Sequence, residues 1–65
     1  SKATISFSTD SYQPEIYFTL DGSEPTTKST LYKKPFDVRR SVTVKAASFK
    51  NGKQVGKTTI QQIVL

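Results

Sequence analysis

Apolar and polar residues alternate in two stretches near the start of the chain. In segment 4–8 the alternate positions hold Ile5 and Phe7, with polar residues between them. The same alternation in segment 15–20 is carried by Ile16, Phe18 and Leu20. Because successive side chains of a strand point to opposite faces, each stretch predicts a strand with one buried face. The polar residues between them end at Pro14, which cannot donate to a strand ladder, so a break is predicted there.

A second clear alternation runs from Ser41 to Phe49. Its apolar positions are Val42, Val44 and Ala46. A shorter extended piece is predicted over residues 29–32, and Phe36 and Val38 are predicted to fill the core from an edge strand.

The pair Asn51-Gly52 predicts a tight hairpin turn, after which residues 53–65 return as the last strand. A plain two-residue turn places Ile60 on the outer face. We therefore predict a displaced register that sets Val42 opposite Ile60. The displacement can arise from a bulge at the turn or from a bulge near Gly56.

Composition narrows the classes of fold and function. The chain has 65 residues, 34% of them hydrophobic, and contains no cysteine or histidine. No helical period or internal repeat is evident, and turn signals recur about every ten residues, which predicts one all-β sandwich domain over residues 1–65. Disulfides, a zinc centre and histidine acid–base chemistry are excluded. No stretch approaches the roughly 20 apolar residues of a membrane span, and no cofactor is expected.

The net charge of +5 favours an acidic partner in principle. The only local clusters of cations are the doublets Lys33-Lys34 and Arg39-Arg40. Neither doublet has the interleaved aromatic residues that stack single-stranded bases. A nucleic-acid partner is therefore not expected, and a basic module that binds another polyanion stays as an alternative.

The stretch DGSEP, residues 21–25, is either a reactive site or a corner. A glycine that tolerates positive φ and a proline that fixes its own φ suit a corner. A calcium loop needs more oxygen ligands at loop spacing, and a glycosidase pair needs two carboxylates across a cleft. Asp21 and Glu24 meet neither requirement, so no catalytic or metal-binding residue is predicted.

Two surfaces are candidates for binding. Tyr12 and Tyr17 are candidate stacking platforms for sugar rings, which would make the domain a carbohydrate-binding module. The outer face of the hairpin carries Ala47, Phe49 and Val55, which form a candidate docking patch for a neighbouring domain. The alternative is that these three are ordinary scattered apolar residues of the surface.

The segment IYFTLDGSEPTTKSTLYKKPF, followed by SVTVKAASFKNGKQVG, resembles the chitobiase/β-hexosaminidase C-terminal domain family. The shared features are an I-x-Y-T-x-D-G-S-x-P-T corner, a downstream S-x-x-Y-x-x-P and a T-V-K-A strand before a glycine hairpin. Phe18 stands where the family usually has tyrosine. The match covers nearly the whole chain.

The resemblance implies an immunoglobulin-like or fibronectin-III-like sandwich of about six to seven antiparallel strands. It further implies a non-catalytic domain that packs beside the catalytic domain of a secreted or periplasmic glycoside hydrolase. The isolated domain is expected to be a monomer excised from a larger multidomain protein. The residues implied to build the structural corner are Asp21, Gly22, Ser23, Pro25, Thr26 and Tyr32, the last packing inward.

Overall fold

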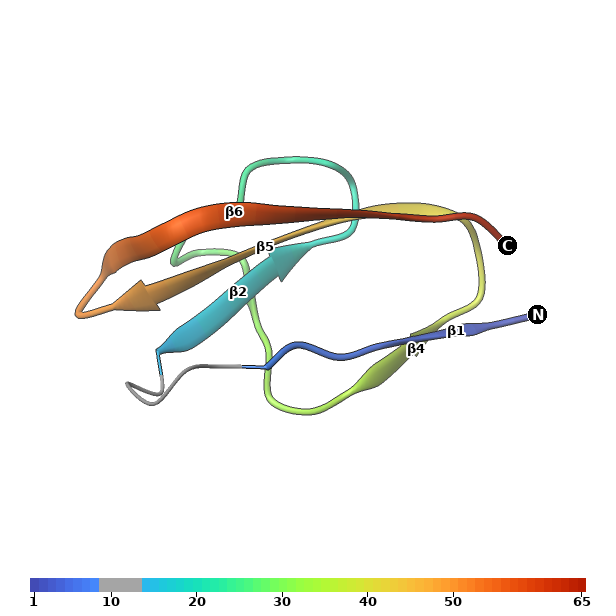
Figure 1. The fold of residues 1–65 in the computed structure, drawn as a ribbon, viewed down its shortest axis with the longest axis horizontal. Helices are drawn as coiled ribbons and strands as arrows, with labels where there is room; N and C mark the ends of the chain where they lie inside the picture. The colour runs from blue at the N-terminus through green and yellow to red at the C-terminus, as the bar shows by residue number, and fades with distance from the viewer. Residues whose placement is uncertain (9–13) are drawn as a thin grey trace.

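Six strands in two sheets make up the fold of the part of the chain that the structure describes. The computed structural model describes residues 1–8 and 14–65, which contain no helix. β1 (Ala3–Ile5) pairs with β4 (Phe36–Val38), and the second sheet has the order β3-β2-β5-β6. The strands of the second sheet are β2 (Glu15–Thr19), β3 (Thr30–Leu31), β5 (Val42–Lys50) and β6 (Lys53–Ile63). Every pairing is antiparallel, and Figure 1 shows the two sheets as stacked layers. The predicted all-β sandwich is confirmed.

The core lies between the two sheets. One cluster of buried side chains comprises Ile5, Val38 and Val44, and the other comprises Ile16, Phe18 and Ala46. Phe7, Leu20 and Phe36 pack against both clusters, so the core is continuous along the sandwich. The rings of Phe18 and Phe36 stack with centroids 4.7 Å apart, which joins β2 of one sheet to β4 of the other.

β1 is shorter than the alternation predicts. Its ladder with β4 runs from the pair Ala3–Val38 to the pair Ile5–Phe36. The next position on β4 is Pro35, which has no N–H to donate, so the ladder ends there. Phe7 still packs into the core, although it lies outside the strand. The alternation therefore predicted correctly that Phe7 packs in the core, but it predicted a longer strand than β1 forms.

The β5–β6 hairpin has a two-residue turn followed by a bulge. Lys50 pairs with Lys53, and the two turn residues have positive φ, 54° at Asn51 and 79° at Gly52, as a type I′ turn requires. Beyond the turn the register shifts between Ala46 and Ser48. Of the two positions predicted for a bulge, the turn and the region of Gly56, the structure has the second, and Gly56 has a φ of 84°.

The bulge does not bury Ile60, and the predicted pairing of Val42 with Ile60 is wrong. On β5 only Ala47 separates the pairs Ala46–Thr59 and Ser48–Val55, whereas three residues, 56–58, separate them on β6. The insertion is therefore two residues, which leaves the inward and outward positions of β6 unchanged. Ile60 lies opposite Lys45 and is 61% exposed. The residue that packs on the core is Ile63, opposite Val42.

Replacing Gly56 by L-alanine should destabilise the domain by about 1 kcal/mol, because an L-residue is strained at positive φ. A Cβ atom at this position meets nothing within 4 Å, so the cost comes from the backbone alone. Chemical denaturation of the synthetic chain measures the change. D-alanine at the same position is the matched control and should be tolerated. Equal stability of the two diastereomers would contradict this account of the bulge.

Candidate functional site

The DGSEP corner is closed by hydrogen bonds among its own residues. Oδ1 of Asp21 accepts the Ser23 hydroxyl at 2.6 Å and the Ser23 backbone N–H at 3.0 Å. The Thr19 hydroxyl donates to the Ser23 carbonyl at 2.6 Å, and Gly22 has a φ of 84°. The two bonds from Ser23, that of its hydroxyl first and that of its backbone N–H second, lower the pKa of Asp21 below its usual range. Asp21 is therefore an ionised turn residue and a poor proton donor.

The rest of the loop is held in the same way. Backbone N–H of Ser29 donates to the Thr26 carbonyl, and backbone N–H of Thr26 donates to the Ser29 hydroxyl, both at 2.9 Å. The Lys28 N–H donates to the Thr26 hydroxyl at 3.1 Å. Pro25 is fully buried. The polar groups of Thr26 and Ser29 therefore serve the conformation of the loop itself.

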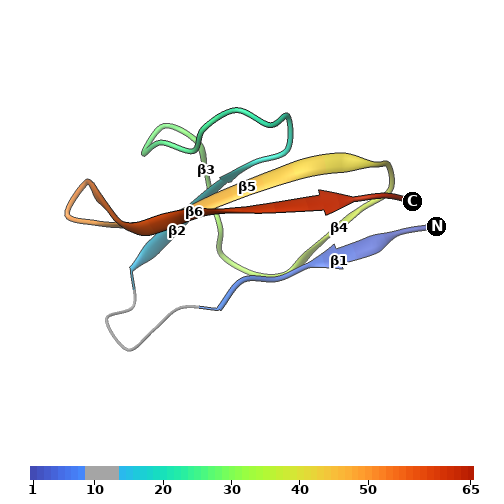
Figure 2. The same ribbon diagram turned by 45° about the horizontal axis from the view of Figure 1, so that its top comes forward.

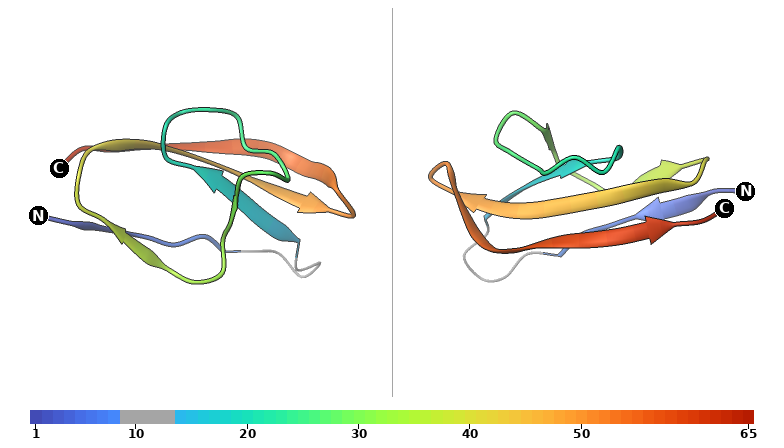
Figure 3. Two further views of the ribbon diagram at one scale, coloured as in Figure 1. Left: turned by 180° about the vertical axis from the view of Figure 1, so that it is seen from behind. Right: turned by 90° about the horizontal axis from the view of Figure 1, so that it is seen from above.

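Glu24 fastens this loop to the far edge of the sheet. The Thr58 hydroxyl of β6 donates to Glu24 Oε2 at 2.5 Å, and the Gln54 side-chain amide donates to the Thr58 hydroxyl at 3.2 Å and to the Gly56 carbonyl at 3.3 Å. We call these bonds the Glu24–Thr58 latch. The loop lies on the side of the second sheet that faces away from β1 and β4 (Figures 1 and 3). Asp21 and Glu24 thus have different partners and do not form a carboxylate pair.

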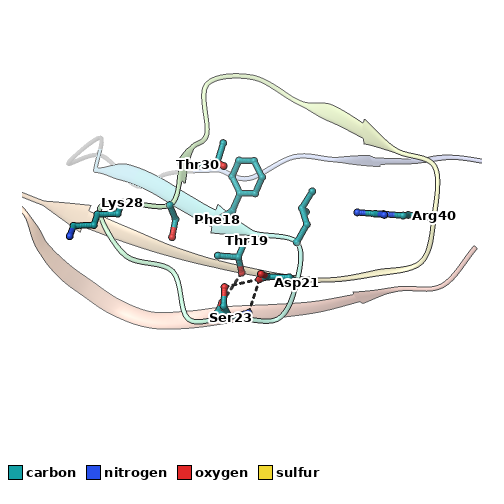
Figure 4. A pocket seen from close by; sticks show the side chains of 9 residues that line it. Phe18, Thr19, Asp21, Ser23, Lys28, Thr30 and Arg40 are labelled. Atoms are coloured by element: carbon teal, nitrogen blue, oxygen red, sulfur yellow. Dashed lines mark hydrogen bonds between the residues drawn. The ribbon is translucent and has the colours of Figure 1, made fainter.

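A hollow of about 370 Å³ lies beside the corner (Figure 4). Asp21 is its only carboxylate among the described residues, and Asp21 and Ser23 are bonded to each other. The two cations that line it, Lys28 and Arg40, lie at opposite ends with the corner between them. Residues 1–8 and 14–65 also contain no group of three or more histidine, cysteine or acidic residues that could hold a metal ion. The hollow therefore offers no acid–base pair for glycoside hydrolysis.

The tyrosines take structural positions where the structure describes them. The Tyr17 ring is half-buried and meets Phe49 edge to face, with centroids 5.5 Å apart. Tyr32 meets Phe7 edge to face at 4.9 Å, and its backbone N–H donates to the Ile16 carbonyl at 2.7 Å. Tyr12, the other candidate sugar contact, lies outside the described residues.

The candidate docking patch is not an exposed surface. Ala47 and Phe49 are only 3% and 7% exposed, although they lie on the outer face of β5; Tyr17 pairs with Ala47 and its ring meets that of Phe49. The β2–β3 loop lies on the same side of the sheet (Figure 1). Val55 is 44% exposed but pairs with Ser48, which places it on the opposite face from Phe49. The sequence pattern shows which face a residue takes, and it does not show that a loop covers that face.

Exposed apolar residues gather instead at the end of the chain. Ile60 is 61% exposed, Val64 79% and Leu65 44%. The run of aliphatic residues that closes the sequence is the only signal that could have located them. The cations of the two doublets, Lys33, Lys34, Arg39 and Arg40, are all exposed on the connections that follow β3 and β4. No helix of the described residues is long and apolar enough to cross a membrane.

Removing the hydroxyl of Thr58 should destabilise the domain by about 1 kcal/mol, the usual net value of a hydrogen bond. We expect Thr58→Val to release the loop and to expose Pro25. Urea denaturation gives the free energy, and amide exchange of residues 21–29 reports on the loop. Thr59→Val, one residue further along β6, is the matched control. A double-mutant cycle of Thr58→Val with Glu24→Ala that showed no coupling would argue against the latch.

Phe49→Ser should unfold the isolated domain. Truncating a buried phenylalanine costs about 3–5 kcal/mol, which is comparable to all the stability that a core of this size supplies. Loss of chemical-shift dispersion in the NMR spectrum of the variant measures the effect. Val55→Ser, at the exposed member of the candidate patch, should change stability by no more than about 0.5 kcal/mol. A folded Phe49→Ser domain would restore the exposed-patch interpretation.

A comparison with protein families agrees with the resemblance seen in the sequence and with the all-β fold. The family model of the chitobiase/beta-hexosaminidase C-terminal domain matches residues 1–60. Comparisons with curated proteins and with solved structures gave no significant match. The family is a C-terminal domain of these enzymes, which indicates an accessory place rather than a catalytic one. The chain belongs to the chitobiase/beta-hexosaminidase C-terminal domain family.

Proposed function

We propose that this chain is a non-catalytic packing and spacing module, which holds a neighbouring catalytic domain of a carbohydrate-active enzyme in place. The observation that carries the proposal is that the acidic side chains of the corner form hydrogen bonds within the domain. Asp21 and Glu24, the two acids of the DGSEP corner, bond to Ser23 and Thr58. A site for catalysis or recognition keeps such groups available to a ligand, and this loop uses them to hold its own shape.

The surface supports a docking role more than a sugar-binding role. The Tyr17 ring meets Phe49 and is half-buried, so it does not present the open flat face on which a sugar ring stacks. The exposed apolar residues Ile60, Val64 and Leu65 lie together on β6 and just after it, where a neighbouring domain can cover them. The partner is a catalytic domain of the same polypeptide, outside the cell or in the periplasm as in the family's glycoside hydrolases, and the module is monomeric by itself.

Titration of the chain with oligosaccharides of chitin, cellulose and xylan tests this function. We expect the NMR signals of Tyr17 and Tyr12 to stay in place at millimolar sugar, and we expect no hydrolysis of the same oligosaccharides. Heparin is the control for the polyanion alternative. Saturable shifts with one sugar would make the domain a carbohydrate-binding module. Heparin binding that weakens steeply with salt would make it a polyanion-binding module.

A further inference from the structure

Both sheets of the sandwich end in an open edge on the same side. In the described residues β6 has a strand neighbour only at β5, and β1 has one only at β4. Figure 2 shows β1 and β6 running side by side at this edge without being joined in one sheet. The backbone N–H and C=O groups on the free side of β6 are therefore available for pairing with another strand.

A groove follows this edge. Two hollows, of about 320 and about 260 Å³, share Ser6, Phe7 and Thr59 in their walls. The larger one also reaches Ile5, Val44 and Ile63, which belong to the core. We call the two together the β1–β6 groove. Core side chains are thus accessible from this side of the sandwich, where a closed sandwich would have a further strand.

The second half of the edge strand, after the bulge, lacks the features that keep most edges unpaired. Thr58–Leu65 contains no charged residue, and Ile60 and Val64 are highly exposed. From Thr59 to Ile63 every residue pairs with β5 without interruption, so this half of β6 is regular. A regular, uncharged, apolar edge pairs readily with another chain, and natural proteins usually cover it.

Charge decides which occupant fits. β6 carries Lys53 and Lys57, and among the residues that the structure describes the lining of the groove includes no aspartate or glutamate. A second copy of this chain would bring the same lysines to the edge and a further net charge of +5. An acidic segment is attracted to the same edge.

We propose that the β1–β6 groove accepts an extended, acidic polypeptide segment as an added strand beside β6. Main-chain hydrogen bonds to the free side of β6 supply affinity. Apolar side chains at alternate positions enter the groove toward Phe7 and Ile63, and a carboxylate lies near Lys57. The inference rests on the docking role proposed above, because it names the element of the neighbouring domain that docks.

A pair of adjacent glutamines offers a matched test. Gln61 pairs with Val44 and lines the groove, whereas Gln62 pairs with Thr43 on the other face of the sheet. The probe is a short synthetic peptide in which valine alternates with threonine and glutamate, titrated into the folded chain. We expect saturable NMR shifts at Thr59, Gln61 and Ile63. Gln61→Trp should weaken binding at least about tenfold by filling the groove, and Gln62→Trp should not.

Two further peptides test the chemistry. A peptide with lysine in place of glutamate should bind more weakly, and Lys57→Glu in the protein should reverse that preference. A peptide with N-methylated backbone amides should not bind, because it cannot donate to β6. Equal binding of the N-methylated peptide, indifference to Gln61→Trp, or dimerisation of the chain through β6 would each overturn the proposal. Sugar binding in the titration above would instead overturn the accessory role and leave the strand-accepting edge standing.

Discussion

The burial of β5 on both faces is the constraint on which the rest of the structure depends. Val44 and Ala46 face the other sheet, while Ala47 and Phe49 face outward and are still almost fully buried. A sandwich of two thin sheets covers only the inner face, so a loop has to cover the outer one. The loop of residues 20–29 lies on that side of the sheet, and the latch between Glu24 and Thr58 joins it to β6. The corner is polar because a loop lying over a sheet must satisfy its own backbone groups.

This constraint also explains why the two acids of the DGSEP corner have separate structural partners. Asp21 orders the turn by accepting two bonds from Ser23, and its backbone bridges to Thr43 at the start of β5. Glu24 is directed away from Asp21 toward β6. A pair of carboxylates three residues apart is therefore separated by the fold, and neither is left to act as an acid, a base or a metal ligand in concert with the other. The family is a C-terminal domain of these enzymes, and the structural roles of Asp21 and Glu24 are consistent with an accessory domain.

Much of the fold could be predicted from the sequence, because each strand shows its own period. The positions of the strands, the Asn51-Gly52 turn and a bulge near Gly56 all follow from local residue types. The predictions that needed knowledge of distant partners were wrong. The end of β1 depends on Pro35, which directly precedes β4 and is distant from β1 in the chain. The burial of Phe49 depends on a loop that no pattern in β5 indicates. The sequence alone therefore could not show whether Ala47 and Phe49 are exposed or covered.

The exposure of Ile60 follows from the spacing of the isoleucines in β6. Ile60 and Ile63 are separated by an odd number of positions, so a regular strand cannot place both on the same face. A bulge of one residue would bury Ile60 and turn Ile63 away from Ile5 and Val38, at the end of the sandwich where the core has few other side chains to spare. The two-residue bulge keeps Ile63 in the core and leaves Ile60 outside. The same choice of face directs Thr59 and Gln61 inward, where they line an open groove instead of closing it. The register of β6 against β5 therefore has two consequences. It places Ile63 in the core at one end of the molecule, and it leaves an open apolar edge along β6.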